Sequence, residues 1–223
     1  MLAYGAVIAE LYRERGLRAW TWHEAADARR FRPLPELERE HDLVWVGNWG
    51  DGERTRELHE FLLEPARALR LDGSVHGVRY PPEAVEAVTR SGLRYRGWLA
   101  NHEVPQVFAR HRVTVHVPRR PYVERLPGIP TIRPFEALAC GIPLVSAPWD
   151  DVEGLFEPGR DFLVARDGDE MREHLRAVLA DEEVARSLAE NGRATILARH
   201  TCAHRVDELE AILRELRPVE AVA

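Results

Sequence analysis

Short runs of Val, Ile, Leu and Trp alternate along most of the chain with stretches whose apolar positions recur at helical spacing. The apolar runs predict six strands, at residues 43–46, 74–78, 93–96, 113–117, 143–146 and 162–165. The stretches between them predict helices at residues 54–71, 82–91, 102–111, 131–140 and 152–156. Because strands and helices alternate at this spacing, we predict an α/β fold with a doubly wound, mostly parallel, Rossmann-like sheet.

The pattern changes at both ends of the chain. After the last predicted strand only helical spacing remains, and C-terminal helices are expected at residues 167–180, 182–200 and 203–217, followed by a frayed tail at 218–223. At the start, residues 2–15 have an amphipathic pattern and residues 20–35 have the composition of a linker. No strand is expected before His41. We therefore interpret residues 1–40 as a helix and interdomain linker, the remnant of a missing N-terminal domain, and residues 41–217 as the domain itself.

Composition limits the class of protein and of partner. The chain has 223 residues, of which 45% are hydrophobic and 30% charged, and a net charge of −6. This balance is typical of a globular protein and argues against nucleic-acid binding, which requires a basic surface. The apolar start of the chain is interrupted at Glu10, far too early for a membrane span, and two cysteines are too few for a disulfide framework. We expect a cytoplasmic protein. Every fixed positive charge is arginine, which excludes a lysine-dependent phosphate loop.

The stretch 126–146 carries the strongest candidate chemistry. A loop rich in Gly and Pro leads to Thr131, which suits a helix N-cap, and Gly141 ends the helix that follows. The free amides at this helix start and the guanidinium of Arg133 face the carboxyl ends of the strands, where doubly wound sheets bind ligands. Glu136 lies one turn further, where a carboxylate can accept two hydrogen bonds from a sugar diol. The same residues also fit a structural loop and helix in which Glu136 interacts with the helix dipole, and both interpretations stay open at this point.

The segment from Arg133 to Gly141, Arg-Pro-Phe-Glu-Ala-Leu-Ala-Cys-Gly, resembles the donor-site helix of the GT-B glycosyltransferases. Within them it is most similar to the CgeB-like, spore-maturation-type group. Residues 45–48, 95–99 and 151–165 also resemble that family, and the likeness covers roughly residues 41–213. The resemblance implies that the chain is a single GT-B half, the domain that binds a nucleotide-diphosphate sugar for transfer of a hexose to an acceptor hydroxyl.

The resemblance also implies which residues contact the donor. They are Gly47, Asn48, Arg54, Arg56, Trp98, Arg119, Thr131, Ile132, Arg133 and Glu136. Glu136 would hold the ribose hydroxyls, and the helix start from Thr131 to Arg133 would meet the diphosphate. Either Arg54 or Arg56 would serve where many relatives offer an Arg and a Lys, because a guanidinium can hold phosphate through two hydrogen bonds. Trp98 would border the base, and the loop that contains Arg119 would face the donor sugar.

The remaining expectations concern cofactors and partners. No metal and no cofactor is expected, since the arginines and the helix start stabilise the departing diphosphate and the nucleotide sugar is a substrate. Gly128 stands where many retaining relatives carry the first of two Glu residues. A catalytic base is expected on the missing N-terminal domain, so the chain would be inactive without that domain or a partner chain. The alternative hypothesis is a catalytically silent binding or interaction module that completes a partner chain.

Several other motifs are better explained by structure than by chemistry. The Asp-Gly-Asp at residues 167–169 begins a helix, so capping is favoured over a metal-binding motif. The two histidines within 200–204 lack further ligands, which favours a helix junction over a metal site. His116 fits either a hydrogen-bonded core residue or a donor contact. Trp49 and Trp98 follow strands and are candidates for ligand contact.

Overall fold

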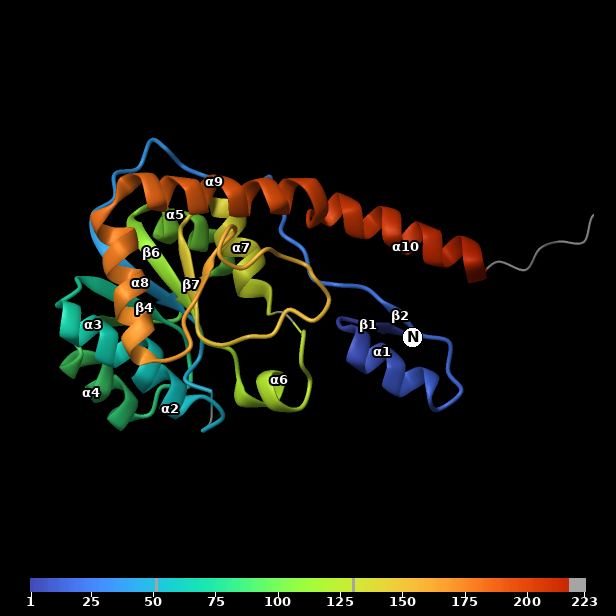
Figure 1. Cartoon of the computed structure of the whole chain (residues 1–223), viewed down its shortest axis with the longest axis horizontal. Helices are drawn as coiled ribbons and strands as arrows, with labels where there is room; N and C mark the ends of the chain where they lie inside the picture. Colours follow the sequence, from blue (N-terminus) through green and yellow to red (C-terminus); the bar gives the residue numbers. More distant parts are fainter. Residues whose placement is uncertain (51, 130, 217–223) are drawn as a thin grey trace, which may run out of the picture.

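The computed structural model describes residues 1–50, 52–129 and 131–216. The main sheet has six parallel strands in the order β5-β4-β3-β6-β7-β8. It lies among the helices of the larger part of the molecule (Figure 1). Its strands are β3 (His41–Val46), β4 (Gly73–His76), β5 (Arg94–Gly97), β6 (His111–His116), β7 (Leu144–Ser146) and β8 (Leu163–Val164). The strand order reverses direction between β3 and β6, which are neighbours. All six predicted strands are confirmed to within a few residues, and so is the doubly wound α/β fold.

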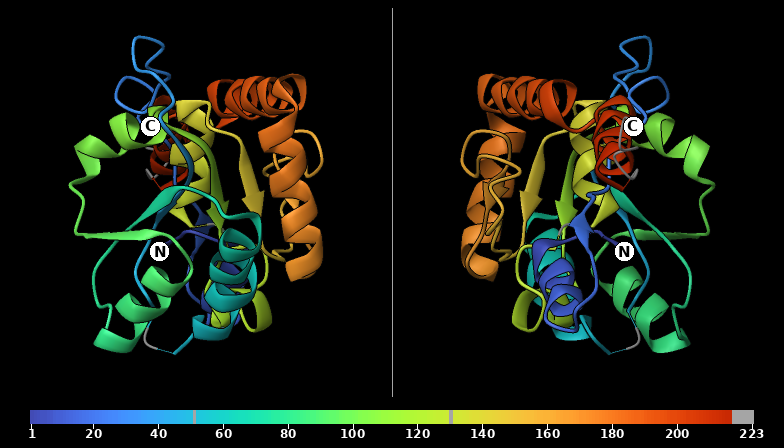
Figure 2. Two further views of the ribbon diagram at one scale, coloured as in Figure 1. Left: turned by 90° about the vertical axis from the view of Figure 1, so that its left-hand side faces the viewer. Right: turned by 90° about the vertical axis from the view of Figure 1, so that its right-hand side faces the viewer.

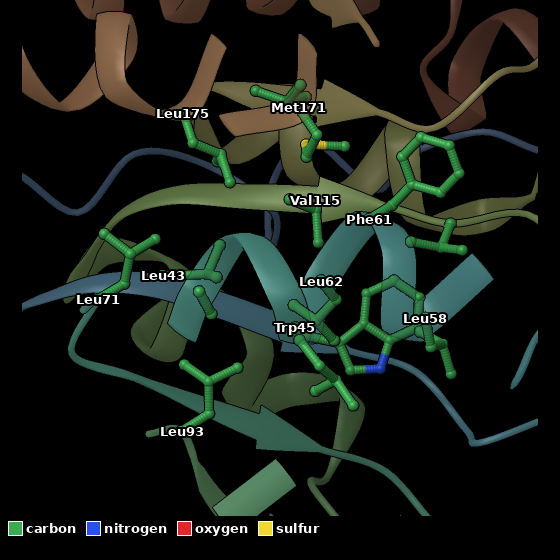
Figure 3. Close-up of a cluster of buried hydrophobic side chains, with 14 of the residues drawn as sticks. Leu43, Trp45, Leu58, Phe61, Leu62, Leu71, Leu93, Val115, Met171 and Leu175 are labelled. Atoms are coloured by element: carbon green, nitrogen blue, oxygen red, sulfur yellow. The ribbon is translucent and has the colours of Figure 1, made fainter. Parts of the chain in front are cut away.

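Helices cover both faces of the sheet because the strands are apolar on both sides. Leu43 and Trp45 of β3 belong to one buried cluster, and Val44 and Val46 belong to the cluster on the opposite face. Figure 3 shows the first cluster, in which Trp45 lies beside Leu58 and Leu62 of the helical segment that follows β3. The first face is covered by α2 (Thr55–Leu58), η1 (His59–Leu63), α3 (Glu64–Leu69), α4 (Pro82–Arg90) and α8 (Gly168–Ala180). The second face is covered by α5 (Val104–Ala109), α7 (Ile132–Cys140) and part of α9 (Glu182–Arg199).

The first forty residues differ from the expectation. A strand β1 (Leu2–Ala3), a helix α1 (Ala6–Arg13) and a strand β2 (Trp20–Thr21) form a small unit, in which the two strands pair in parallel. The expectation of a helix and linker without a sheet was therefore wrong. Gly5 is extended, with φ −173°, and separates β1 from α1. This N-terminal unit stands to one side of the main sheet, beside α10 (Cys202–Leu216), as Figures 1 and 2 show.

Three further segments correct the predicted boundaries. The helix expected at 54–71 begins at Thr55 and is interrupted by the π-helical turn η1. The helix expected at 152–156 is absent: Gly154 has a positive φ of 62°, and the Asp151 carboxylate accepts a hydrogen bond from the Phe156 amide across the resulting turn. A short helix α6 (Arg120–Glu124) forms where a loop was expected, because Pro121 occupies the first turn, where proline is tolerated.

The C-terminal helices agree with the prediction within the described residues. They are α8, α9 and α10, and η2 (Asn101–Glu103) is a 3₁₀ turn that leads into α5. Arg217 and the expected frayed tail at 218–223 lie outside the described residues. Within the described part of the chain, no helix is both long enough and apolar enough to cross a bilayer.

Candidate functional site

The carboxyl ends of β3 and β6 meet the start of α7 at one edge of the sheet. In a parallel sheet all strands end at the same edge, and doubly wound sheets bind ligands where the strand order reverses, which here is between β3 and β6. Two hydrogen bonds tie the three segments together. Arg54 Nη1, in the loop after β3, donates to the carbonyl oxygen of Val117 at 3.1 Å, and His116 Nε2, at the end of β6, lies 3.1 Å from the Thr131 hydroxyl. Residues that lie far apart in the sequence thus form one site.

Arg54 is a buried cation within this site. Its side chain donates to the carbonyl oxygen of Asn48, with 3.1 Å from Nε, and to that of Val117, and it lies 5.2 Å from the centre of the Trp45 ring. Among the described residues, no carboxylate forms an ion pair with it. Burial lowers the pKa of Arg54 to about 10, with a smaller contribution from the positive charge of Arg119. A buried charge without a counter-ion is costly, and an anionic ligand would remove that cost.

Two more guanidinium groups add to the positive potential. Arg119 pairs with Glu53, with 2.9 Å between Nη1 and Oε2, and its charge acts on Arg54. Arg133, in the first turn of α7, also lowers the pKa of Arg54. The buried His116 lies within the field of both Arg54 and Arg133, and burial, assisted by these two charges, lowers its pKa to about 3. His116 is therefore neutral and hydrogen-bonded at neutral pH, and the positive charge at this edge comes from arginine.

Glu136 is the buried carboxylate of the site. Only 3% of the residue is exposed, and burial raises the pKa of its carboxyl group. Asn101 Nδ2 donates to Oε1 at 3.2 Å, and Arg133 Nη1 donates to Oε2. The carboxylate is thus satisfied by one side chain from η2 and one from its own helix. Asn101 was not singled out from the sequence, and its position shortly after Trp98 was the only available signal.

The start of α7 is less capped than expected. Thr131 occupies the N-cap position with extended backbone, φ −96° and ψ 162°, but its side chain makes no capping hydrogen bond. Its hydroxyl bonds His116 instead. The first amides of α7, from Ile132 onward, are therefore not capped by Thr131, and such amides suit an anion. At the other end, Gly141 ends the helix in the left-handed conformation, as predicted.

The loop after β3 is fixed by hydrogen bonds between side chains and the backbone. Tyr80 donates its hydroxyl to the carbonyl oxygen of Gly47 at 2.9 Å, and the Val78 amide donates to Asn48 Oδ1 at 3.1 Å. Arg56, by contrast, has a side chain that is 77% exposed and pairs with Glu57, which also pairs with Arg120. The structure brings Gly47, Asn48 and Arg54 together with α7.

The two tryptophans that were candidates for ligand contact differ in exposure. Trp49 is buried, with its ring 5.9 Å from that of His59 and 5.5 Å from that of Tyr80. These three side chains line a separate cavity of about 740 Å³ beside α4. Trp98, which follows β5, is 73% exposed. Of the two, Trp98 offers a free aromatic surface.

One residue near the site comes from an unexpected part of the chain. Glu24, which follows β2, lies within the electrostatic field of both Glu136 and Arg133. Burial and, to a smaller extent, the charge of Glu136 raise the pKa of Glu24 to about 7, although Arg133 opposes the change. No sequence pattern indicated this placement, because it depends on contacts between segments that lie far apart in the sequence.

The structural explanations of the other motifs hold. Asp167 caps α8 by accepting hydrogen bonds from the amides of Asp169 and Glu170. His200 bonds the carbonyl oxygen of Leu155, and His204 bonds the Thr201 hydroxyl, so both stabilise the junction of α9 and α10. The described residues hold no group of three or more His, Cys, Asp or Glu side chains placed to share a metal ion.

Several solved structures have a fold similar to that of this chain. The chain matches sucrose-phosphate synthase from Thermosynechococcus elongatus with a TM-score of 0.70 at 18% identity, covering 96% of this chain and 57% of that one. It matches Anabaena HepE, solved with UDP and glucose, with a TM-score of 0.72 at 17% identity, covering 96% and 62%. It matches the pneumococcal O-GlcNAc transferase GtfA, solved with UDP and GlcNAc, with a TM-score of 0.69 at 11% identity, covering 96% and 44%. The chain thus has the Rossmann-like fold found in GT-B glycosyltransferases and spans less than two thirds of these proteins.

The family follows from the sequence comparison. No curated protein matches the chain. The model of one protein family, described as glycosyl transferase-like, matches residues 54–211, which include Arg54, Arg133 and Glu136. Because this match covers well over half of the 223 residues, the chain belongs to the glycosyl transferase-like family.

Proposed function

We propose that the chain is the donor-binding domain of a glycosyltransferase of the CgeB-like group and that it binds a uridine diphosphate sugar. The observation that carries this proposal is Arg54, a buried cation without a carboxylate partner among the described residues, next to the uncapped start of α7. A diphosphate supplies the missing negative charge. HepE and GtfA, which share the fold, were solved with UDP, and this supports the choice of base.

The diphosphate binds between the loop after β3 and α7. Arg54 contacts it from one side, and the amides of Ile132 and Arg133 contact it from the other. When the bond between the anomeric carbon and the diphosphate breaks, negative charge develops on the leaving oxygen, and these fixed donors stabilise it. Transfer on this scheme is metal-independent, because arginine and the helix start supply the charge.

Arg133 and Glu136 exchange partners when the nucleotide binds. In the structure they pair with each other within one turn of α7. The diphosphate draws the Arg133 guanidinium away, which frees Glu136 Oε2 to accept hydrogen bonds from the ribose diol. Asn101 continues to hold Oε1 and keeps the carboxylate in place. The exposed Trp98 borders the base, and Arg119 faces the donor sugar.

The residues described above concern the donor and do not include a binding site for the acceptor. The chain spans 57% of sucrose-phosphate synthase and 62% of HepE. We propose that the acceptor hydroxyl and the catalytic base are supplied by an N-terminal domain or a partner chain, and that the chain alone binds the donor without turnover. We place the reaction in the cytoplasm.

A second candidate function is a catalytically silent module that completes a partner chain. Exposed apolar side chains on the N-terminal unit and on α10 favour it: Leu2, Tyr4, Leu17, Val206 and Leu213. Such a module would leave Arg54 and Glu136 without a ligand. Nucleotide titration therefore separates the two functions.

Calorimetric titration of the chain with UDP, GDP and UDP-glucose tests the proposal. We expect the wild type to bind UDP and Glu136→Ala to weaken binding by about 1.5–3 kcal/mol, since hydrogen bonds to a charged group are lost. Glu36→Ala, an exposed position remote from α7 in the sequence, is the control and should leave the affinity unchanged. A folded wild-type protein that binds none of the three ligands contradicts the proposal.

A further inference from the structure

The segment that leaves the N-terminal unit is fixed against the sheet domain. Arg205 Nε donates to the carbonyl oxygens of His23 and Glu24, each at 3.1 Å, and His23 Nε2 lies 3.0 Å from Glu153 Oε2. Ala26 forms a bridge with Thr201 just beyond. With its backbone held on both sides, Glu24 has a defined position next to α7.

The carboxyl group of Glu24 is incompletely satisfied. Its Oε2 is buried and has no hydrogen-bond partner among the described residues, although Arg133 and Glu136 lie within its electrostatic field. The nearby Arg133 is engaged by Glu136. Buried polar atoms are nearly always hydrogen-bonded in native proteins, so this oxygen is suited to accept a hydrogen bond from a ligand.

Unpartnered buried polar atoms also lie on the segment that contains Glu24 and on a loop that is joined to this segment. They are His23 Nδ1 on the same segment, and Trp149 Nε1 and Asp151 Oδ1 on the loop that follows β7. His23 joins the two segments through Glu153. The Trp149 ring lies 6.2 Å from that of His116, which bonds Thr131 at the start of α7. These atoms include both hydrogen-bond donors and acceptors.

We propose that Glu24 is a further residue of the donor site and that its carboxyl group hydrogen-bonds a sugar hydroxyl of the bound nucleotide sugar, beside Glu136. This inference rests on the proposed function. A hydroxyl both donates and accepts, so it satisfies the carboxyl oxygen whether or not the carboxyl is protonated. The raised pKa of Glu24, about 7, supports this, because both forms are present near neutral pH. The hydroxyl belongs either to the ribose or to the transferred hexose.

Titration of the full chain with UDP and UDP-glucose tests the role of Glu24 and identifies the sugar. We expect Glu24→Ala to weaken binding about 2- to 10-fold, the loss of one hydrogen bond, and Glu24→Gln, which keeps an acceptor and a donor, to restore most of it. An equal loss for UDP and UDP-glucose assigns the ribose. A loss for UDP-glucose alone assigns the hexose.

A second variant and a matched control keep the test decisive. Glu24→Asp preserves the charge but withdraws the carboxyl by one methylene, so it should lose affinity as Glu24→Ala does even if the alanine variant unfolds. Glu36→Ala removes an exposed carboxylate of the same N-terminal region and should bind as the wild type does. Wild-type affinity in both folded Glu24→Asp and Glu24→Ala overturns the inference and leaves the proposed function intact. A wild type that binds neither ligand overturns both.

Discussion

A guanidinium group that is buried without a carboxylate partner, as Arg54 is among the described residues, loses hydration that carbonyl hydrogen bonds replace only in part. Of its neighbours, Arg119 and Arg133 increase this cost through like charge, while Glu53 and Tyr80 offset it in part. The buried position of the Arg54 guanidinium is therefore maintained by the rest of the fold. At the scale of single residues, Arg54 therefore indicates an anion more directly than the paired Glu136 indicates a sugar.

Substitution of the two neighbouring arginines distinguishes their roles. Arg54→Lys keeps the charge but removes the planar fork that holds carbonyl oxygens and phosphate together, so we expect UDP affinity to fall by about 1–2 kcal/mol. Arg56→Lys alters a side chain that is exposed and paired with Glu57, and affinity should stay the same. Calorimetric titration of both variants measures the difference. The reverse order of effects would reassign the phosphate contact to Arg56.

The sequence could name candidates at this scale but could not rank all of them. Two residues apart at the start of a helix, Arg54 and Arg56 point in very different directions, and only the packing of the loop after β3 decides which is buried. Glu24 was missed because a contact between distant segments leaves no local pattern. The core of the α7 motif was recognisable because its residue types are contiguous.

At the scale of elements, the loop after β3 depends on a close approach between two strand ends. A Cβ atom on Gly77, directly after β4, would lie 2.0 Å from the carbonyl oxygen of Gly47. Relief of such a clash would require the backbone to shift, which costs free energy. Gly77 thus allows β3 and β4 to end side by side and positions the loop that carries Asn48 and Arg54.

Replacement of Gly77 by alanine should therefore destabilise the protein more than an ordinary loop glycine does. We expect Gly77→Ala to lower the free energy of unfolding by about 3 kcal/mol or more, as overpacking against backbone does. Gly92 also has a positive φ, 90°, but a Cβ there meets no atom within 4 Å, so Gly92→Ala should cost only about 1 kcal/mol. Urea unfolding of both variants compares them. Equal losses would show that backbone conformation, and not the contact with Gly47, sets the cost.

Strands and helices with long hydrophobic patterns could be predicted from the sequence, and very short ones could not. The central strand β3 has apolar residues at consecutive positions because both of its faces are buried, and the strands beside it carry shorter apolar runs. The edge strand β5, Arg-Tyr-Arg-Gly, is only partly buried and has the weakest apolar signal of the six. Strands of two residues, such as β1 and β2, are too short for any periodicity. The false helix at 152–156 came from local composition, which does not reveal the left-handed turn at Gly154.

At the scale of the whole molecule, two hydrogen bonds attach the N-terminal unit to the rest of the chain. Trp20 Nε1 donates to Glu215 Oε2 of α10 at 2.8 Å, and the Ala6 amide donates to Glu153 Oε1 at 2.7 Å. The first contact anchors the unit to the C-terminal helix and the second to the loop after β7. This double attachment fixes the N-terminal unit, and Glu24 follows that unit directly in the sequence.

The pH dependence of stability integrates buried groups from the whole molecule. Burial lowers the pKa of His111 to about 4, of His116 to about 3 and of His200 to about 4. As the pH falls below 6.5, these histidines are therefore protonated in the unfolded chain but stay neutral in the folded chain, which favours unfolding. Glu24 and Glu136 act in the opposite sense, because burial raises their pKa values and acid relieves them. Each group contributes up to about 1.4 kcal/mol per pH unit, so three histidines outweigh two carboxyl groups. We expect the midpoint of urea unfolding to fall between pH 7 and pH 5, and a midpoint that rises would show that the carboxyl groups dominate.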